Sequence, residues 1–289
     1  MRKTERLKKL VQDREILVAP GVHDCLTARI IEEQGFSALY MTGYGTSASM
    51  LGKADVGLLT LTEMAWRVSR IADAVDIPLI ADGDTGYGNA VNVARTVREY
   101  EKAGAACIQL EDQVAPKKCG HMTGREIIPS DEMAGKIKAA CDSRHDRDFM
   151  IMARTDARTT HGIDEAIERG HIYAEAGADI LFIESPETED EMKTITTSFD
   201  VPVLANMVEH GRSPFLPVPK LQETGYDIAI FPVTATFAMA RAVSDVMKLL
   251  KETGSTMDYK DRMMDFETFN DLVGLSEIRE MEKKYSTGR

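Results

Sequence analysis

Two short stretches of this sequence carry residue types that could bind a metal ion and move protons. In ADGDTGYGN, Asp82 and Asp84 flank one glycine at the end of an apolar run. Side chains two apart in an extended segment point the same way, so we expect both carboxylates to face one point. Glu111, at the end of the next apolar run, would complete an all-oxygen cluster. Such a cluster suits Mg²⁺, with Mn²⁺ as an alternative, better than zinc. The other interpretation of Asp84 is a cap for the helix that opens at Asn89.

The second stretch, PKKCGHMTGRE at residues 116–126, directly follows the LEDQ sequence that contains Glu111. Cys119 lies between lysines and His121, and such an environment lowers the pKa of a thiol and favours a role in proton transfer. The two glycines of the stretch would let it move, so we predict a mobile active-site loop over residues 114–127. Taken alone, the cysteine could equally belong to an ordinary exposed loop. Its place after a predicted strand end favours a site.

The elements that must position these residues are short apolar runs that alternate with helical patterns. Continuous apolar runs are typical of parallel strands buried on both faces, and the helical patterns stop at Gly35, Gly104 and Gly177. Eight such units predict an α/β fold, a (β/α)8 TIM barrel, as a single domain over residues 1–289. A doubly wound sheet is the alternative, but no GxGxxG turn follows the first run. The predicted strands are Ile16–Gly21, Ala38–Gly43, Pro78–Asp84, Cys107–Asp112, Phe149–Asp156, Ile180–Ser185, Pro202–Met207 and Ile228–Val233.

Polar residues stand at the end of most of these runs, where the active site of a barrel lies. A helix cap or a surface ion pair would explain any one of them, but several buried charges converging on one rim indicate a site. Arg154, with Lys117 and Lys118, would make the pocket locally positive and suited to a substrate with two carboxylates. The residues concerned are Thr42, Gly43, Tyr44, Asp82, Asp84, Glu111, Asp112, Arg154, Asp156, Glu184, Asn206, Pro232 and Thr234.

The end of the chain lies outside the eight units. A helix is predicted near residues 235–252, followed by an amphipathic helical tail over residues 256–289. The tail either packs on its own barrel or docks on a neighbouring subunit, and its pattern favours neither.

Composition narrows the class of protein. The net charge of −12 argues against general nucleic-acid binding, which needs cations against phosphates. We see no secretory signal pattern and no apolar run long enough to cross a membrane, so we expect a cytoplasmic protein. The four cysteines form no zinc-module spacing, and Cys25, Cys107 and Cys141 fit apolar structural positions.

The combination of KKCGH at residues 117–121, DGDTGYG at residues 82–88 and the preceding LEDQ resembles the isocitrate lyase/phosphoenolpyruvate mutase superfamily. The likeness covers nearly the whole chain, including PGVHDCLTARIIEEQGF, ARTDAR and ANMVEHG. It implies a Mg²⁺-dependent (β/α)8 barrel that assembles as a homotetramer and swaps its C-terminal helices between subunits.

The resemblance also implies roles for individual residues. The metal cluster falls on Asp55, Asp82, Asp84 and Glu111, with Asp82 as the direct ligand. Lys117 and Cys119 belong to the loop that gates the pocket. The catalytic residues implied are Cys119, Lys117, Arg154 and Tyr44. The substrate-binding residues implied are Thr42, Gly43, Tyr44, Asp82, Gly120, His121, Arg154, Glu184, Asn206 and Pro232.

Within the superfamily, the cysteine of KKCGH is typical of the lyases that break a carbon–carbon bond. The chain lacks the long insertions of the large isocitrate lyases, and Tyr44 and Lys118 depart from the pattern of the short tricarboxylate lyases. The resemblance therefore implies cleavage of a 2-hydroxydicarboxylate such as 2,3-dimethylmalate into pyruvate and propionate. Cys119 would be the general acid, and the base would be Tyr44 or a water on the metal. The alternatives are 2-methylisocitrate cleavage to pyruvate and succinate, oxaloacetate hydrolysis, a phosphonate reaction, which Cys119 argues against, and a non-catalytic barrel.

Overall fold

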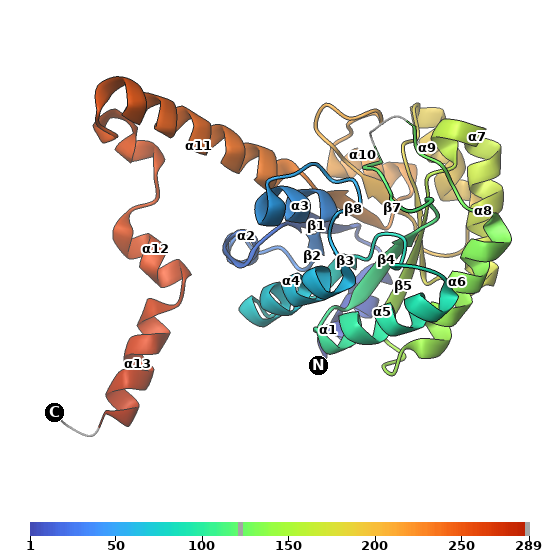
Figure 1. The fold of residues 1–289 in the computed structure, drawn as a ribbon, viewed down its shortest axis with the longest axis horizontal. Helices are drawn as coiled ribbons and strands as arrows, with labels where there is room; N and C mark the ends of the chain where they lie inside the picture. The colour runs from blue at the N-terminus through green and yellow to red at the C-terminus, as the bar shows by residue number, and fades with distance from the viewer. Residues whose placement is uncertain (121–123, 287–289) are drawn as a thin grey trace.

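The computed structural model describes residues 1–120 and 124–286, and they form a (β/α)8 barrel (Figure 1). Eight parallel strands pair in the order β6-β5-β4-β3-β2-β1-β8-β7. A parallel bridge between Leu181 and Val203 joins β6 to β7 and closes the sheet. This confirms the predicted fold and its eight strands. The strands are β1 (Leu17–Val22), β2 (Leu39–Met41), β3 (Leu79–Asp82), β4 (Cys107–Glu111), β5 (Met150–Thr155), β6 (Ile180–Ile183), β7 (Leu204–Asn206) and β8 (Ile228–Phe231).

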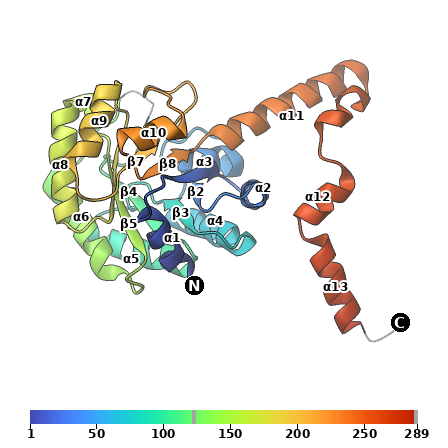
Figure 2. The ribbon, with the colours of Figure 1, turned by 180° about the vertical axis from the view of Figure 1, so that it is seen from behind.

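Helices surround the strands on the outside of the barrel (Figure 1). The first of them, α1, packs Leu7 and Val11 into the buried cluster that contains the first residues of several strands, so it covers the N-terminal end of the barrel (Figure 2). The helices up to the last strand are α1 (Lys3–Val11), α2 (Cys25–Glu33), α3 (Gly43–Leu51), α4 (Leu61–Ala74), α5 (Ala90–Lys102), α6 (Ser130–Ser143), α7 (Arg158–His161), α8 (Ile163–Glu175), α9 (Glu189–Ser198) and α10 (Val218–Thr224).

Local sequence explains many of the helix ends. Asn89 caps α5 by accepting hydrogen bonds from Val91 N and Asn92 N, which confirms the predicted start and excludes Asp84 as the cap. Gly35, Gly104 and Gly177 follow their helices with positive φ, a conformation in which glycine lacks the steric penalty of other residues. The predicted stops are therefore confirmed.

Seven of the eight predicted strands run one or two residues past the observed end, and two of these overruns bear on the site. β2 ends at Met41, and Gly43 is the first residue of α3, whose cap is Thr42. β3 ends at Asp82, and Asp84 has a φ of 47°, in the left-handed region. The backbone turns at both places because it leaves the sheet ladder, so the alternation of an extended strand does not apply to Asp84.

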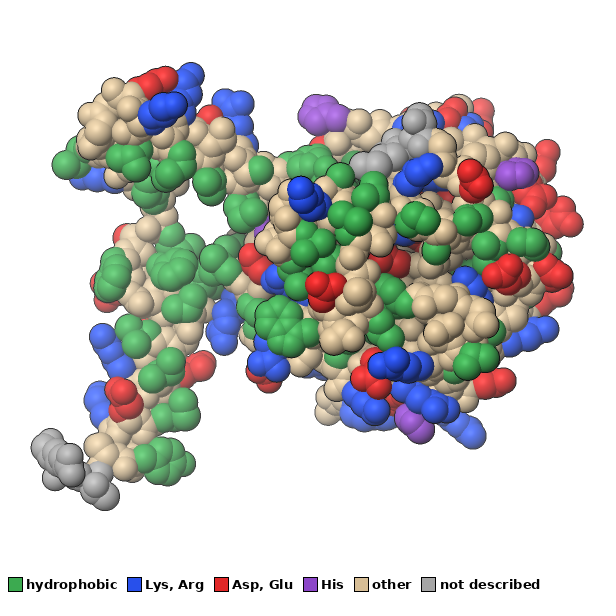
Figure 3. All heavy atoms as spheres, in the orientation of Figure 1, with side chains coloured by type: hydrophobic (Ala, Val, Ile, Leu, Met, Phe, Trp, Pro, Cys, Tyr) green, Lys and Arg blue, Asp and Glu red, His purple; other side chains and the backbone are tan. Residues whose placement is uncertain are grey.

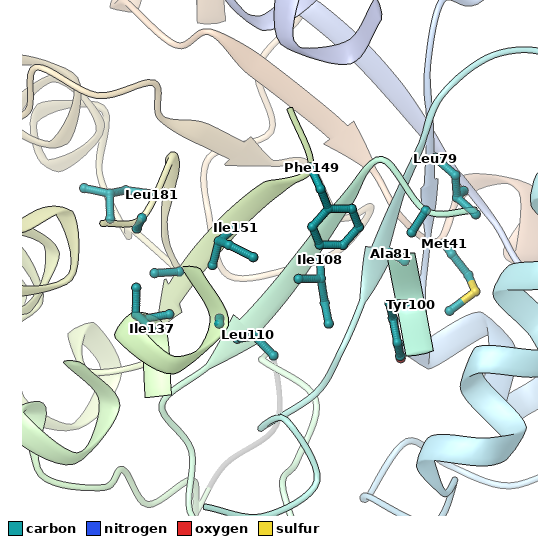
Figure 4. Packing of buried hydrophobic residues seen from close by; sticks show 14 of the residues in the cluster. Met41, Leu79, Ala81, Tyr100, Ile108, Leu110, Ile137, Phe149, Ile151 and Leu181 are labelled. Atoms are coloured by element: carbon teal, nitrogen blue, oxygen red, sulfur yellow. The ribbon is translucent and has the colours of Figure 1, made fainter. Parts of the chain in front are cut away.

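The core lies between the strands and the helices that cover them. Leu79, Ile108 and Ile151, from three neighbouring strands, pack with Tyr100 of α5 and Ile137 of α6 (Figure 4). All five are fully buried. Fully burying one such aliphatic side chain stabilises a fold by roughly 1.5–3 kcal/mol. This layer therefore holds the strands firmly against the helices, and with them the polar residues that follow the strands.

The C-terminal region leaves the barrel. Helix α11 (Thr234–Thr253) runs outward, and the 3₁₀ helix Met257–Arg262, α12 (Phe266–Leu272) and α13 (Leu275–Tyr285) follow at a distance from the barrel body (Figure 1). The tail approaches α2 at one point, where Arg29 donates to the carbonyl of Leu272 over 3.3 Å. Of the helices in the described part of the chain, none is long and apolar enough to cross a membrane.

Candidate active site

A cavity of about 340 Å³ opens at the C-terminal ends of the strands. Most predicted site residues meet there. Gly43 and Asp84 are not part of the described lining, and His121 lies outside the described residues. The predicted residues on its wall are Thr42, Tyr44, Asp55, Asp82, Glu111, Lys117, Cys119, Gly120, Arg154, Glu184, Asn206 and Pro232.

Lys117 lies among the carboxylates rather than open to an incoming anion. Its Nζ is 2.6 Å from Asp55 Oδ2 and 2.8 Å from Asp84 Oδ1, and all three side chains are buried. Burial opposes the charge of Lys117, but Asp84, Asp82, Glu111 and Asp55 together raise its pKa well above the ordinary value. Lys117 therefore stays charged and neutralises the acidic cluster from within.

Asp82 is fixed by backbone donors. Its Oδ2 accepts from Gly43 N over 3.1 Å and its Oδ1 accepts from Asp84 N over 3.0 Å. A Cβ on Gly43 would lie 2.5 Å from Asp82 Oδ2, so this close approach requires glycine. The N–H of Gly43 consequently serves Asp82, which leaves Thr42 and Tyr44 as the part of the α3 terminus that faces the cavity.

Glu111 is a buried carboxylate with one oxygen that could bind a metal ion. It is buried, and its Oε1 has no hydrogen-bond partner within residues 1–120 and 124–286. Burial raises the pKa of Glu111 well above its usual range, although Arg154 and Lys117 work in the other direction. A bound cation would satisfy this oxygen and favour the charged form.

The carboxylates of the cavity fit Mg²⁺ that keeps part of its water shell, as Mg²⁺ in proteins usually does. Within the described residues, no three His, Cys, Asp or Glu side chains converge closely enough to hold an ion without rearrangement. Mg²⁺ keeps several waters and needs one or two protein carboxylates, so Asp82 and Glu111 suffice as candidate ligands. Asp55 and Asp84 would act at longer range, because Lys117 already pairs with both.

Arg154 links three acidic groups at the ends of β4, β5 and β6. Its Nε and Nη2 donate to the two oxygens of Asp156 over 2.9 and 3.0 Å. Nη2 lies 3.2 Å from Glu184 Oε2, and Nη1 lies 3.5 Å from Glu111 Oε2. Burial opposes the charge, but Asp156, Glu111 and Glu184 raise the pKa of Arg154 well above its usual value. The guanidinium is therefore a fixed cation on the cavity wall.

Asn206 and Glu184 complete this side of the wall. Asn206 Nδ2 donates to Glu184 Oε2 over 3.1 Å, and Asn206 Oδ1 is buried with no hydrogen-bond partner in the part of the chain that the structure describes. An unsatisfied amide oxygen at a cavity is ready to accept from a substrate hydroxyl.

Phe237 is a wall residue that the sequence did not single out. Its ring meets the ring of Tyr44 edge to face, with the centroids 6.1 Å apart. Tyr40, Val208 and Ile230 also line the cavity, so one part of the wall is apolar. The position of Phe237 in the first turn of the helix after the eighth strand could have indicated a wall residue. Helical periodicity alone, however, predicts that an aromatic residue there packs against the barrel.

Partial burial raises the pKa of Tyr44, and the neighbouring Cys119 and Asp55 raise it further. The phenol therefore stays protonated at neutral pH, where it can donate a hydrogen bond but is a poor base.

The family model described as Phosphoenolpyruvate phosphomutase matches residues 7–251. The chain belongs to the phosphoenolpyruvate mutase/isocitrate lyase superfamily. This confirms the resemblance that the KKCGH and DGDTGYG stretches indicated.

Several curated superfamily members are similar over almost the whole chain. The 2,3-dimethylmalate lyase of Eubacterium barkeri is 57% identical over 289 residues, which is all of both chains. The petal death protein of Dianthus caryophyllus is 44% identical and covers 96% of this chain and 88% of its own. A 2-methylisocitrate lyase of Aeropyrum pernix is 44% identical and covers 97% of this chain and 90% of its own.

Solved structures of superfamily members share the fold closely. A 2,3-dimethylmalate lyase superposes with a TM-score of 0.92 at 36% identity, covering 98% of this chain and 95% of its own. An oxaloacetate acetylhydrolase in complex with the inhibitor 3,3-difluorooxalacetate has a TM-score of 0.92 at 34% identity, covering 98% and 96%. A phosphonopyruvate hydrolase in complex with oxalate and Mg²⁺ has a TM-score of 0.89 at 32% identity, covering 99% of each chain.

Proposed function

We propose that this superfamily member is a Mg²⁺-dependent carbon–carbon lyase that cleaves a 2-hydroxydicarboxylate of the 2,3-dimethylmalate type into pyruvate and propionate. The observation that carries the proposal is that Cys119 lines the same cavity as the fixed cation Arg154 and the carboxylates Asp82 and Glu111. A thiol proton donor, a cation and a carboxylate pair are the groups that such a cleavage needs. The 57% identity with a 2,3-dimethylmalate lyase supports the substrate class.

Mg²⁺, held by Asp82 and Glu111, would polarise the C1 carboxylate and C2 oxygen of the substrate as a Lewis acid. On the protein side, Arg154 would offset negative charge near C2, and Thr42 and Tyr44 would bind a carboxylate at the N-terminus of α3. Asn206 Oδ1 would accept a hydrogen bond from a substrate hydroxyl.

In the cleavage, a base removes the proton of the C2 hydroxyl and the C2–C3 electron pair moves onto the departing fragment. Cys119 would donate its proton to C3 of that fragment and become a thiolate, so that propionate leaves fully protonated at carbon. The raised pKa of Tyr44 argues against this phenol as the base. Tyr44 is better suited to hold a substrate oxygen by donating to it.

The cavity wall favours a dicarboxylate over a tricarboxylate. Among the described wall residues, Lys117 and Arg154 pair with buried carboxylates and Lys118 donates to the carbonyl of Gly124, so these three cations are already engaged before a third substrate carboxylate could bind. The apolar patch of Tyr44 and Phe237 suits methyl substituents instead. The second candidate is 2-methylisocitrate cleavage, which the Aeropyrum relative supports, and the third is oxaloacetate hydrolysis.

A product screen tests this proposal. With Mg²⁺ present, we expect kcat/KM for pyruvate release to be about 10-fold or more higher on 2,3-dimethylmalate than on 2-methylisocitrate, citramalate or oxaloacetate, the scale on which pockets discriminate alkyl groups. EDTA should abolish the activity and added Mg²⁺ should restore it. Preference for 2-methylisocitrate would move the assignment to that reaction, and turnover unaffected by EDTA would contradict the metal dependence.

We also infer that the C-terminal helices pack against a second copy of this chain in a homotetramer. Apolar side chains on α12 and α13 are largely exposed, with Phe266 at 86% and Tyr285 at 71%, and Figure 3 shows apolar groups along the tail. Exposed apolar surface on this scale indicates an interface.

The paired substitution Phe266→Asp and Ile278→Asp should shift the mass measured by light scattering toward the monomer. Val91→Asp is the control, because Val91 is an apolar residue on the barrel whose exposed fraction, 78%, lies between those of Phe266 and Ile278. An unchanged mass in the tail variant would contradict the interface.

A further inference from the structure

The segment that carries Cys119 is tied down on both sides of the cysteine. On the N-terminal side, the Gln113 side chain pairs with the backbone of Lys118. Gln113 Nε2 donates to Lys118 O over 2.9 Å, and Lys118 N donates to Gln113 Oε1 over 2.9 Å. Gln113 is 1% exposed, so both bonds are shielded from competing water.

On the C-terminal side, Ser185 holds Gly120. Ser185 Oγ lies 3.2 Å from Gly120 O and 3.0 Å from Glu184 Oε1, so its single proton is shared between two acceptors. Ser185 lies two residues after the end of β6 and adopts a φ of 59°, and its hydroxyl meets the loop at Gly120 O. A non-glycine residue in this conformation is uncommon and indicates a specific local constraint.

The backbone of Gly120 lies directly against the active-site wall. A Cβ added there would lie 2.8 Å from the carboxyl of Glu184 and still closer to Arg154 Nη2. The loop backbone can lie this close to Glu184 and Arg154 because residue 120 has no side chain. Hydrogen bonds and close packing thus act on the two neighbours of Cys119, which itself lines the cavity.

We propose that Gln113 and Ser185 are positioning residues that seat Lys118 and Gly120 and thereby hold the Cys119 thiol at the cavity. Neither side chain belongs to the described cavity wall, so neither is placed to contact a substrate. Both lie at the end of a strand, Gln113 after β4 and Ser185 after β6, so the rigid barrel fixes the position of a loop residue. The proposal rests on the proposed function for the role of Cys119 as proton donor.

The alkylation rate of Cys119 tests whether Gln113 and Ser185 hold its thiol in place, and this measurement does not require catalytic activity. Wild type, Ser185→Gly and Gln113→Leu are treated with iodoacetamide in the presence of Mg²⁺, and the Cys119 peptide is followed by mass spectrometry. Glycine accepts the φ of Ser185, and neither substitution changes a charge. We expect Ser185→Gly to raise the alkylation rate by about 2- to 10-fold, the effect of losing one hydrogen bond, and Gln113→Leu by at least as much. On the active substrate, kcat should fall more than KM changes.

Ser198→Gly is the matched control, because the Ser198 hydroxyl also donates to a backbone carbonyl, that of Thr194, but at the end of α9. Cys141, half-buried on α6, is the internal reference. If both variants melt like the wild type and Cys119 reacts at the wild-type rate, the proposal is wrong. Should either variant fail to fold, Gly120→Ala replaces it, since a methyl group there must lift the segment and raise the same rate. Wild type without lyase activity would refute the proposed function but leave this comparison interpretable.

Discussion

Replacing Cys119 with serine is expected to lower kcat by about 10²-fold or more, the usual contribution of a positioned general acid. A serine hydroxyl has nearly the same shape as the thiol but is a far weaker acid. The change therefore removes proton donation to the departing fragment and preserves the packing of the loop. Measurement of kcat on the preferred substrate, together with the melting temperature, checks both halves of this expectation.

Cys25→Ser is the control for that experiment, because Cys25 is half-buried at the start of α2 and away from the cavity. We expect it to retain wild-type kcat. A near-normal kcat for Cys119→Ser would contradict the assignment of Cys119 as the proton donor. The apolar wall and the Arg154 cation would then have to serve another reaction.

The barrel was predictable from the sequence because each strand is a nearly continuous apolar run and each helix has local stop and start residues. Asn89 and Gly104 bound α5 through their own backbone and side-chain preferences, which do not depend on distant parts of the chain. The strand ends at Met41 and Asp82 were less predictable. They depend on which residue last pairs with the neighbouring strand, and this is a property of the closed sheet.

The types of residue in the site were also predictable, since several carboxylates and an arginine at the ends of apolar strands are hard to explain as packing residues. Their pairing was not. Lys117 meets Asp55 across a sequence separation that no local pattern reports, and Asp55 itself came from the resemblance alone. The sequence did not single out Gln113 or Ser185 either, because a side-chain hydrogen bond to a loop backbone, whether local or distant, leaves no periodicity in the sequence.

The pairing of Lys117 leads to the second large effect, on stability. Substituting Lys117 with methionine should lower the free energy of unfolding by about 3–5 kcal/mol, the range found when one partner of a buried ion pair is removed. The carboxylates of Asp55 and Asp84 would stay buried without the ammonium that lies 2.6 and 2.8 Å from them. Burial already raises the pKa of Asp84 to about 6 even with Lys117 in place.

Lys118→Met is the matched control, since Lys118 is the next residue of the same loop and its ammonium reaches a backbone carbonyl, that of Gly124. Urea unfolding in EDTA should place Lys118→Met near the wild type and Lys117→Met far below both. The deficit should also depend on pH. With Lys117 gone, the folded state binds more protons than the unfolded state between the ordinary aspartate pKa and the raised one, so the stability of Lys117→Met rises as the pH falls from 8 to 5. Equal stability of the two variants at pH 8 would mean that water or rearrangement relieves the buried carboxylates. In that case the acidic cluster would be accessible enough to bind Mg²⁺ without Lys117 of the loop.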